Sequence, residues 1–471
     1  MNLFFTKKTI VVFGLILLST TYISAEGYQV NALSAKQGGM ANVGTALKLR
    51  AESMHFNPAG LAFMDKTLDL SAGVSAVFSN AEFSQTQEDG SYKHKSDTKP
   101  STPIYFYGGF KIYDFLSAGI SVNTPYGSSM DWGTNWAGSG LIQDISLKSF
   151  SIQPTLAYKI NDRLSVGAGM MIMFGDFSLS RALIPAGAMN ALGALAPAVS
   201  ATHPGYDLTA ELNKYKDIPA YSATLKGDAG VRLGFNIGAM FDITDRITVG
   251  VSYRSKVKMK VKEGKAGLDY ANESHLREMA AIVNPIAEQL LGKVNAIPLL
   301  PLDKGTFKAE LPLPSNLTFG VAYRPMEKLL LAGEVQFVGW SAYKELNVQF
   351  SQEVLGGYNI NAEKKYKNSR IYRLAGEYKA TDRLNLRLGF YFDESPVRKN
   401  YLNPETPSMN KLGTTVGASF YPTERFSVDF SFAYITGFGR DGSYPYPGGT
   451  VFEGHYEVYA INPTIGLAYS F

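Results

Sequence analysis

The sequence contains no cysteine, so neither disulfide bonds nor thiol chemistry contribute to its structure or function. Beyond its N-terminal segment it has no run of about 18 uncharged apolar residues, which excludes helical membrane spans. It also lacks a large excess of either charge, because 45 basic residues face 41 acidic ones, a net charge of +4. No nucleic-acid partner is therefore expected.

The sequence likewise lacks the residue spacings that catalytic and metal sites require. None of its five histidines stands at metal-ligand or triad spacing from nearby acidic residues: His55, His94, His203, His275 and His455. The stretch GFGRDG from Gly437 matches a dinucleotide-binding pattern, but it leads into SYPYPGG instead of a helix. We interpret it as a loop, and we expect no enzyme activity, no metal and no cofactor.

The first residues have the order of a secretory signal peptide. Lys7 and Lys8 precede the apolar run TIVVFGLILLSTTYISA, which closes on Ala25 before a polar stretch. This apolar core is shorter than the roughly 20 residues that span a bilayer, so we favour cleavage over anchoring. The predicted signal peptide is residues 1–25, and the mature chain is expected to start near Glu26.

A short motif recurs along the chain and marks tight turns. YKINDRLSVGAGM, FDITDRITVGVSY, YKATDRLNLRLGF and FYPTERFSVDFSF each join two alternating segments through a polar turn. FKIYDFLSAGISV and AYRPMEKLLLAGEV are looser versions of it. Six tight turns linking strands in pairs, with one further strand at each end, predict fourteen strands.

The side chains that follow each turn alternate strictly between apolar and polar, as a half-buried strand requires. After Asp382, Leu386, Leu388 and Phe390 share one face, and Arg387 lies on the other. The first face is too apolar for water and the second too polar for a packed sandwich core. In lipid only a closed barrel satisfies every strand edge. The sequence therefore predicts an all-β fold, a 14-stranded antiparallel transmembrane β-barrel.

The predicted organisation has three parts. The signal peptide is followed by a plug over residues 26–65, rich in small residues, and by the barrel over residues 66–471. Short turns on one side and long connections on the other, two of them partly helical at about 183–221 and 263–305, are typical of outer-membrane barrels. The last strand, INPTIGLAYSF, ends on Phe471, which resembles the signal through which barrel-assembly machinery recognises such proteins.

The chain resembles the FadL/TodX family of outer-membrane transporters for long-chain fatty acids and other hydrophobic compounds. The residues that carry the resemblance are NALSAKQGGMANVGTALKLRAESMHFNPAGLAFM, TPYGSSMDWGTNWAGS and SIQPTLAYKINDRLSVGAGM. The resemblance implies that the N-terminal plug is a hatch inside the lumen. It also implies that ligand is captured by apolar outer loops and released sideways into the membrane, where the third strand bends inward.

Two groups of site residues follow from the hatch and the side exit. Asn57-Pro58-Ala59 marks a sharp turn into a short helical segment, because Asn bonds its own backbone and Pro presets φ. We expect this motif to seat the plug against the wall. Asn123, Pro125 and Gly127 are the predicted ladder breakers beside the lateral opening in strand three.

Two further groups lie in the long connections and strand seven. Apolar residues at helical spacing predict ligand-capture helices or, equally, a packed lid: Met189, Leu192 and Leu195 in one loop, and Leu290 and Leu291 in the other, where Asn284-Pro285 is expected to separate two helices. In strand seven, Val257, Met259 and Val261 continue the phase of lipid-facing Val249 and Val251. Lys256, Lys258 and Lys260 would then face the lumen or the space above it, where they would attract a carboxylate, pair with acids or meet lipopolysaccharide phosphates.

The expected function is passive uptake of hydrophobic molecules, with long-chain fatty acids as the first substrate class. Aromatic hydrocarbon transport, a surface-binding or adhesion barrel, and a porin with an incidental plug remain alternatives. The expected location is the outer membrane of a Gram-negative bacterium. The expected partners are outer-membrane lipid, lipopolysaccharide, a hydrophobic ligand and, through Phe471, the assembly machinery; the chain is expected to be monomeric.

Overall fold

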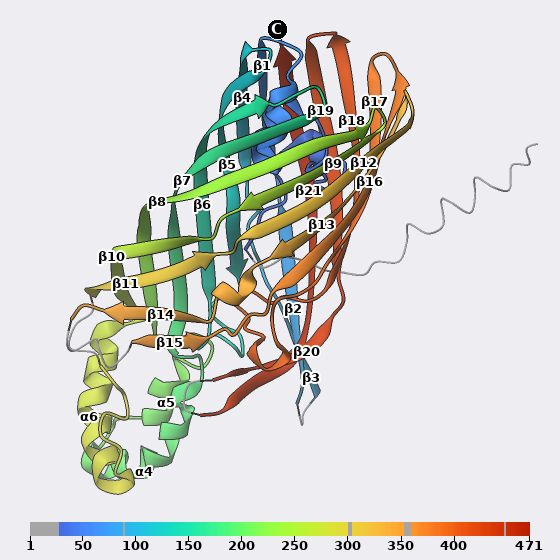
Figure 1. Ribbon diagram of the computed structural model, residues 1–471. Coiled ribbons are helices and arrows are strands. Elements are labelled where there is room, and N and C mark those ends of the chain that lie inside the picture. The colour runs from blue at the N-terminus through green and yellow to red at the C-terminus, as the bar shows by residue number, and fades with distance from the viewer. Residues whose placement is uncertain (1–27, 88–89, 300–303, 353–358, 447–448) are drawn as a thin grey trace, which may run out of the picture.

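The computed structural model describes residues 28–87, 90–299, 304–352, 359–446 and 449–471 (Figure 1). The predicted signal peptide lies outside the described residues. None of the described helices is both long and apolar enough to cross a membrane.

The wall is a ring of fourteen antiparallel strands, as predicted. Each strand pairs with the next, and β21 pairs back with β1 to close the ring. In ring order the strands are β1 (Leu68–Ser75), β4 (Ile104–Tyr113), β5 (Leu116–Asp131), β6 (Asp144–Lys159), β7 (Leu164–Ile184), β8 (Tyr221–Thr244), β9 (Ile247–Arg254), β12 (Asn316–Met326), β13 (Leu329–Val338), β16 (Ser369–Thr381), β17 (Leu384–Asp393), β18 (Lys411–Thr423), β19 (Phe426–Gly437) and β21 (Val451–Ser470).

The long connections build a second tier at one end of the ring, which we call the loop end (Figure 1). Its strands are β2 (Phe78–Gln87), β3 (Gly90–Lys95), β10 (Val257–Tyr270), β11 (Lys304–Leu313), β14 (Glu345–Phe350), β15 (Ile360–Glu363) and β20 (Arg440–Pro445). Its helices are η3 (Ala188–Leu195), α4 (Ala196–Thr202), α5 (Leu208–Asn213), α6 (Glu273–Leu291), η4 (Trp340–Ala342) and η5 (Lys399–Tyr401). Strand seven of the ring, β9, continues into this tier as β10. On the way back, β11 of the tier continues into strand eight of the ring, β12.

The opposite end, the turn end, carries the six predicted tight turns. In three of them a threonine hydroxyl accepts a hydrogen bond from the backbone two residues later: Thr244 from Arg246, Thr381 from Arg383 and Thr423 from Arg425. Leu68 and Phe471 exchange backbone hydrogen bonds of 3.0 and 2.8 Å, so the last strand and the first meet at this end. The recurring Thr-acid-Arg motif is therefore a turn signal with a local cause.

The two faces of the wall have the predicted polarity. On β17, Leu386, Leu388 and Phe390 point outward and are 44–48% exposed, whereas Arg387 points inward and is 6% exposed. Arg387 bonds Glu377 and the hydroxyl of Ser419 inside the lumen. An apolar outside with a hydrogen-bonded polar inside is the arrangement that a lipid environment selects.

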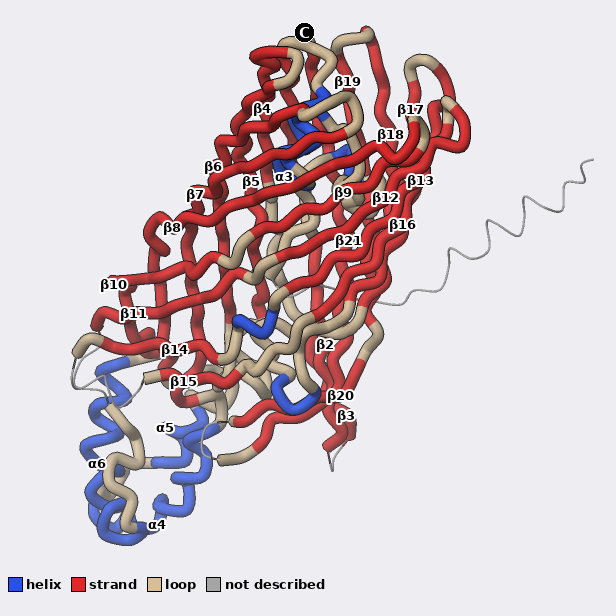
Figure 2. Tube along the Cα trace, in the orientation of Figure 1, coloured by secondary structure: helices blue, strands red, loops and turns tan. Residues whose placement is uncertain are grey.

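The N-terminal segment lies inside the ring near the turn end (Figure 2). Its short helices are α2 (Ala35–Gly38), η1 (Arg50–Glu52), α3 (Ser53–Phe56) and η2 (Pro58–Phe63). Most of its side chains are buried. We call residues 28–65 the plug.

Charged residues of the wall hold the plug. The backbone N–H groups of Gly44 and Thr45 both donate to the carboxylate of Glu334 on β13. Lys48 lies 2.5 Å from Asp242 on β8, and the Ala51 N–H donates to Asp69 at 3.1 Å. Burying these carboxylates inside the barrel without such partners would cost free energy, so plug and wall stabilise one another.

The Asn57-Pro58-Ala59 motif makes hydrogen bonds to β7 and β8. Asn57 caps η2 by accepting from the Ala59 N–H at 3.1 Å, and its amide donates to the carbonyls of Thr45 and Ala239 at 2.7 and 3.0 Å. Ser165 of β7 donates to the Ala59 carbonyl at 3.0 Å. A methyl group added at Gly238 would stand 2.0 Å from the Asn57 side chain, so the wall is shaped for this contact.

One local prediction was wrong. Asn284-Pro285 does not separate two helices, since α6 runs through both residues. The apolar stripe of α6 continues past the proline to Ile286 and Ala287, and the Asn284 side chain bonds both backbone groups of Ile297 at 2.8 and 3.1 Å. Packing therefore outweighs the hydrogen bond that a proline removes.

We predict that the Gly238→Ala change loosens the plug and leaves the barrel intact, because the added methyl group collides with Asn57. Amide hydrogen exchange across residues 44–60 should accelerate about tenfold or more, in line with the loss of one or two buried hydrogen bonds. The matched control is Gly230→Ala on the same strand, where an added methyl group meets no atom within 4 Å. Equal plug protection in both variants would show that this contact does not seat the plug.

Candidate functional site

An apolar pocket lies inside the barrel at the loop end. Its apolar lining comes from six strands and two loops: Tyr28, Ile145, Leu147, Phe177, Ala229, Met259, Val261, Ala309, Leu311, Tyr343 and Leu346. Sequence analysis did not identify these residues as a group, because they converge from distant strands. We call this space the upper pocket.

A change of phase in strand seven creates part of the upper pocket. Arg254 points into the lumen, and so does Val257 three residues later, although strict alternation would put these residues on opposite faces. Ser255 lies at this change of phase and is held by hydrogen bonds to Phe235 through both its backbone N–H and its hydroxyl, each 2.9 Å long. The pairing register with both neighbouring strands is the same before and after Ser255, so no residue is inserted. We call this point the phase change; beyond it the side chains of strand seven exchange faces.

The phase change corrects the predicted orientation of the lysines. Val257, Met259 and Val261 are buried in the lumen and do not face lipid. Lys256, Lys258 and Lys260 point outward, and the last two share Glu310 of β11 as an ion-pair partner. The sequence pattern gave the correct alternation on each side of Ser255 but missed the reversal between them.

A loop covers the upper pocket from outside. Glu405 and Thr406 line the pocket, and Glu405 forms a buried ion pair with Lys364 at 2.5 Å. The Thr406 hydroxyl lies 2.9 Å from that of Tyr366. Burial, and after it the charge of Glu405, raises the pKa of Tyr343 well above its usual value, so this part of the lining stays uncharged.

Tyr28 lines the upper pocket, and Tyr126 packs beside it. Tyr28 begins the described plug and donates to the Pro312 carbonyl, while Tyr126 of β5 donates to the Pro314 carbonyl at 3.0 Å. Their ring centroids are 6.4 Å apart, and Trp340 packs edge-on against Tyr28 at 4.7 Å. We call Tyr28 and Tyr126 the septum, because Tyr28 lines the upper pocket while the next residues of the chain line a second pocket below.

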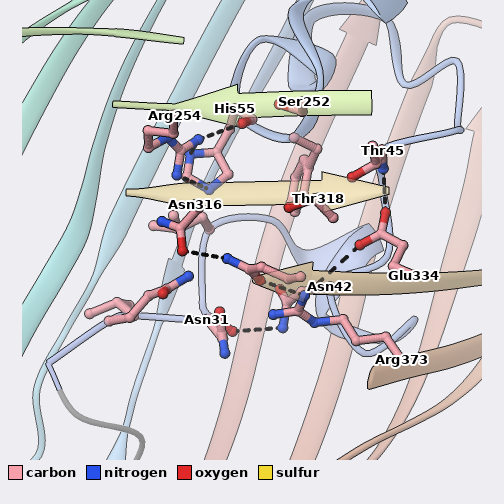
Figure 3. A pocket seen from close by; sticks show the side chains of 15 residues that line it. Asn31, Asn42, Thr45, His55, Ser252, Arg254, Asn316, Thr318, Glu334 and Arg373 are labelled. Carbon is pink, nitrogen blue, oxygen red and sulfur yellow. Dashed lines mark hydrogen bonds and ion pairs between the residues drawn. The ribbon is translucent and has the colours of Figure 1, made fainter. Parts of the chain in front are cut away.

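The second, lower pocket is polar and lies between plug and wall (Figure 3). Arg373 donates there to the side-chain carbonyl of Gln336 at 2.6 Å and lies 4.0 Å from the carboxylate of Glu334. Arg254 instead faces the imidazole nitrogens of His55 at 3.1 and 3.3 Å. Within the part of the chain that the structure describes, no carboxylate lies within the 4.0 Å ion-pair distance of Arg254.

His55 is suited to lie beside a cation. Burial, and after it the neighbouring Arg254 charge, lowers the pKa of His55 well below its usual value. The imidazole is therefore neutral, and it accepts a hydrogen bond without adding or cancelling charge. The Nε group of Arg254 is buried and has no hydrogen-bond partner among the described residues, so the guanidinium retains both charge and donor capacity for an anion.

The predicted ladder breakers lie where β5 leaves its neighbour. Pairing between β4 and β5 ends at Asn123, and the β5 register shifts between Asn123 and Tyr126. Beyond this point the plug takes the place of β4: the Pro125 carbonyl accepts from Val30 at 3.0 Å, and the Gly127 N–H donates to Tyr28 at 2.8 Å. The strand irregularity, the start of the described plug and the septum thus form one unit.

The loop helices pack on one another. Met189, Leu192 and Leu195 are buried in a cluster with Leu276, Met279 and Val283 of α6. Leu290 and Leu291 at the end of α6 remain 57% and 48% exposed. Of the two interpretations of these loops, a packed lid fits Met189, Leu192 and Leu195, which are buried. Of these five residues, only Leu290 and Leu291 are exposed and accessible to a ligand.

The described residues contain no group of three or more histidine or acidic side chains able to hold a metal ion.

Residues 16–471 match the family described as Outer membrane protein transport protein (OMPP1/FadL/TodX).

Relatives and solved structures agree with this match. A putative outer membrane protein of Neisseria meningitidis serogroup B is 26% identical, covering 91% of this chain and 90% of its own. The long-chain fatty acid transport protein of Escherichia coli K12 is 22% identical and covers 92% of each chain. A Pseudomonas aeruginosa FadL homologue has a TM-score of 0.75 at 20% identity, covering 95% of this chain and 100% of its own.

The Pseudomonas putida toluene transporter TodX has a TM-score of 0.67 at 17% identity, and it covers 95% of this chain and 99% of its own. At such identities the solved structures show the shared fold. The match to the family covers nearly the whole chain. This protein therefore belongs to the FadL/TodX family of Gram-negative outer-membrane proteins, which transport hydrophobic compounds and are not enzymes.

Proposed function

We propose that this protein takes up long-chain fatty acids and releases them sideways into the outer membrane beside β5. The observation that carries the proposal is the succession of two unlike pockets: an apolar chamber, then a polar one with a cation that lacks an acidic partner. A fatty acid has the same two parts. Burying its chain in the upper pocket gains about 0.8 kcal/mol per methylene, and Arg254 would bind the carboxylate below.

The proposed route uses the septum as its gate. Ligand would enter from the loop end, reach the upper pocket and pass Tyr28 and Tyr126. It would leave where β5 pairs with the plug instead of with β4, because plug hydrogen bonds there can be exchanged without opening the rest of the ring. Sideways release suits an apolar molecule, which gains nothing by entering the aqueous periplasm.

Aromatic hydrocarbons are the second candidate substrate class. A relative in the family is named a toluene transporter, and the upper pocket by itself would accept a neutral ring. The lower pocket would distinguish fatty acids from hydrocarbons, because a hydrocarbon has no carboxylate that Arg254 could bind.

We predict that Arg254→Gln weakens fatty acid binding at least about tenfold, since a charge-assisted hydrogen bond contributes about 1.5–3 kcal/mol. Binding of a neutral hydrocarbon should change less than twofold. Arg370→Gln is the matched control, because Arg370 pairs with Glu394 at 3.9 Å outside the lower pocket. Equal losses for both ligands would argue against a carboxylate site.

The proposed gate can be locked by a disulfide in this cysteine-free chain. Gln29 and Tyr126 lie opposite each other in an antiparallel bridge, so cysteines at both positions have suitable spacing. Oxidation should lower fatty acid uptake severalfold, and reduction should restore it. Val77 and Ser101 form the other isolated bridge and provide a control pair.

Uptake that is insensitive to the Gln29–Tyr126 crosslink would contradict movement of the plug from β5.

Liposome swelling with a sugar tests the porin alternative. A large sugar flux through the unmodified protein would contradict sideways release, because it requires an open aqueous path through the plug.

We predict that Leu290→Asp with Leu291→Asp lowers hydrophobic uptake severalfold without affecting barrel assembly, because both side chains are exposed on a loop helix. Val451→Asp is a control of similar exposure (61%) at the first residue of β21. Normal uptake with normal surface expression of the double variant would remove these leucines from the capture step.

A further inference from the structure

The outward face of the wall changes character at the phase change of strand seven. Up to that level its neighbours expose apolar side chains, including Phe235 on β8 and Phe319 on β12, each nearly half exposed. Beyond Ser255 the outward positions of strand seven are lysines: Lys256 and, on β10, Lys258 and Lys260. The lysines therefore begin where the lipid-facing belt ends, at the height of the outer-leaflet headgroups.

These lysines belong to a basic surface that spans β8, β10 and β11. Its lysines are Lys226, Lys256, Lys258, Lys260, Lys262, Lys265 and Lys308, and its acidic residues are Asp228, Glu263 and Glu310. Only Lys258 and Lys260 have a carboxylate within 4.0 Å among the described residues, and both use Glu310. We call this surface the basic face; it carries more positive charge than its own acids neutralise.

One pair on the basic face is unfavourable without a bound anion. Lys226 of β8 and Lys265 of β10 stand directly opposite each other across the strand pair, and both are exposed. Like charges in such a position destabilise a sheet. Lysines at every second position of β10 add to this repulsion, since they are separated by only about 6.6 Å along the strand. A multivalent anion would relieve it.

Apolar surface lies directly beside the basic face. Val231 and Leu233 of β8 are 58% and 64% exposed, and a methyl group added at Gly230 would meet no atom within 4 Å. The ladder between β8 and strand seven is formed at Asn236 with Arg254 and again at Ala229 with Val261, but not between these points. The wall thus exposes apolar side chains where the acyl chains of a lipid would lie.

We propose that the basic face binds the phosphate groups of the anionic glycolipid of the outer leaflet, lipopolysaccharide, with acyl chains against Val231 and Leu233. Three features specify this ligand: a cluster of cations, adjacent exposed apolar side chains and a position at the upper edge of the membrane belt. The lysines lie on the face of strand seven opposite Met259 and Val261, which line the upper pocket. The lipid would hold the loop-end tier beside the pocket entrance.

The test measures binding of purified lipid A to the full-length protein in detergent, by native mass spectrometry. The variant Lys256→Gln/Lys258→Gln/Lys260→Gln should bind lipid A at least about tenfold more weakly, and dephosphorylated lipid A should bind the unmodified protein weakly as well. The control Lys111→Gln/Lys159→Gln/Lys379→Gln removes the same charge from the turn end, where each lysine pairs with an acid three residues later. It should bind lipid A as the unmodified protein does.

Raised salt should weaken lipid A binding to the unmodified protein more than to the loop-end variant. Equal binding by the loop-end variant and the turn-end control would overturn the proposal. So would a loop-end variant that binds lipid A normally but takes up fatty acid more slowly while taking up neutral hydrocarbon at the normal rate. That result would assign the lysines to guiding a carboxylate.

Discussion

The structure depends on mutual satisfaction of polar groups between the plug and the inside of the wall. A ring closed in lipid turns its apolar side chains outward, so its inside carries carboxylates and arginines that water alone would otherwise solvate. Glu334, Asp242 and Asp69 find backbone N–H groups or a lysine of the plug as partners. Lys36 of the plug lies 3.7 Å from Asp429 of the wall in the same way. These contacts hold the plug to the inside of the wall.

Departures from regular strand structure shape the inside of the barrel. The phase change at Ser255 turns Met259 and Val261 inward, and both residues line the apolar upper pocket at the loop end. Pairing between β4 and β5 ends at Asn123, and beyond it the plug pairs with β5 instead. The Pro125 carbonyl and the Gly127 N–H keep hydrogen-bond partners there because residues of the plug supply them.

The same phase change links the inside of the barrel to its outer surface. Because side chains alternate, the change that brings apolar residues into the lumen sends Lys256, Lys258 and Lys260 to the outside. The upper pocket and the basic face are thus two sides of one stretch of strand seven. A sequence change that restored regular alternation there would alter both at once, placing lysines in the pocket and apolar residues on the outside.

The sequence by itself determined the number of strands, their order and the lipid-facing side of the regular ones, because alternation of period two and the Thr-acid-Arg turn are local signals. It also indicated the plug and the Asn57 turn, whose hydrogen bond to Ala59 is local. The tertiary structure alone decided the orientation of residues after Ser255, since the phase change there involves hydrogen bonds to Phe235 on another strand. It likewise decided that Leu192 is packed while Leu290 is exposed, because helical periodicity defines a face but not what covers it.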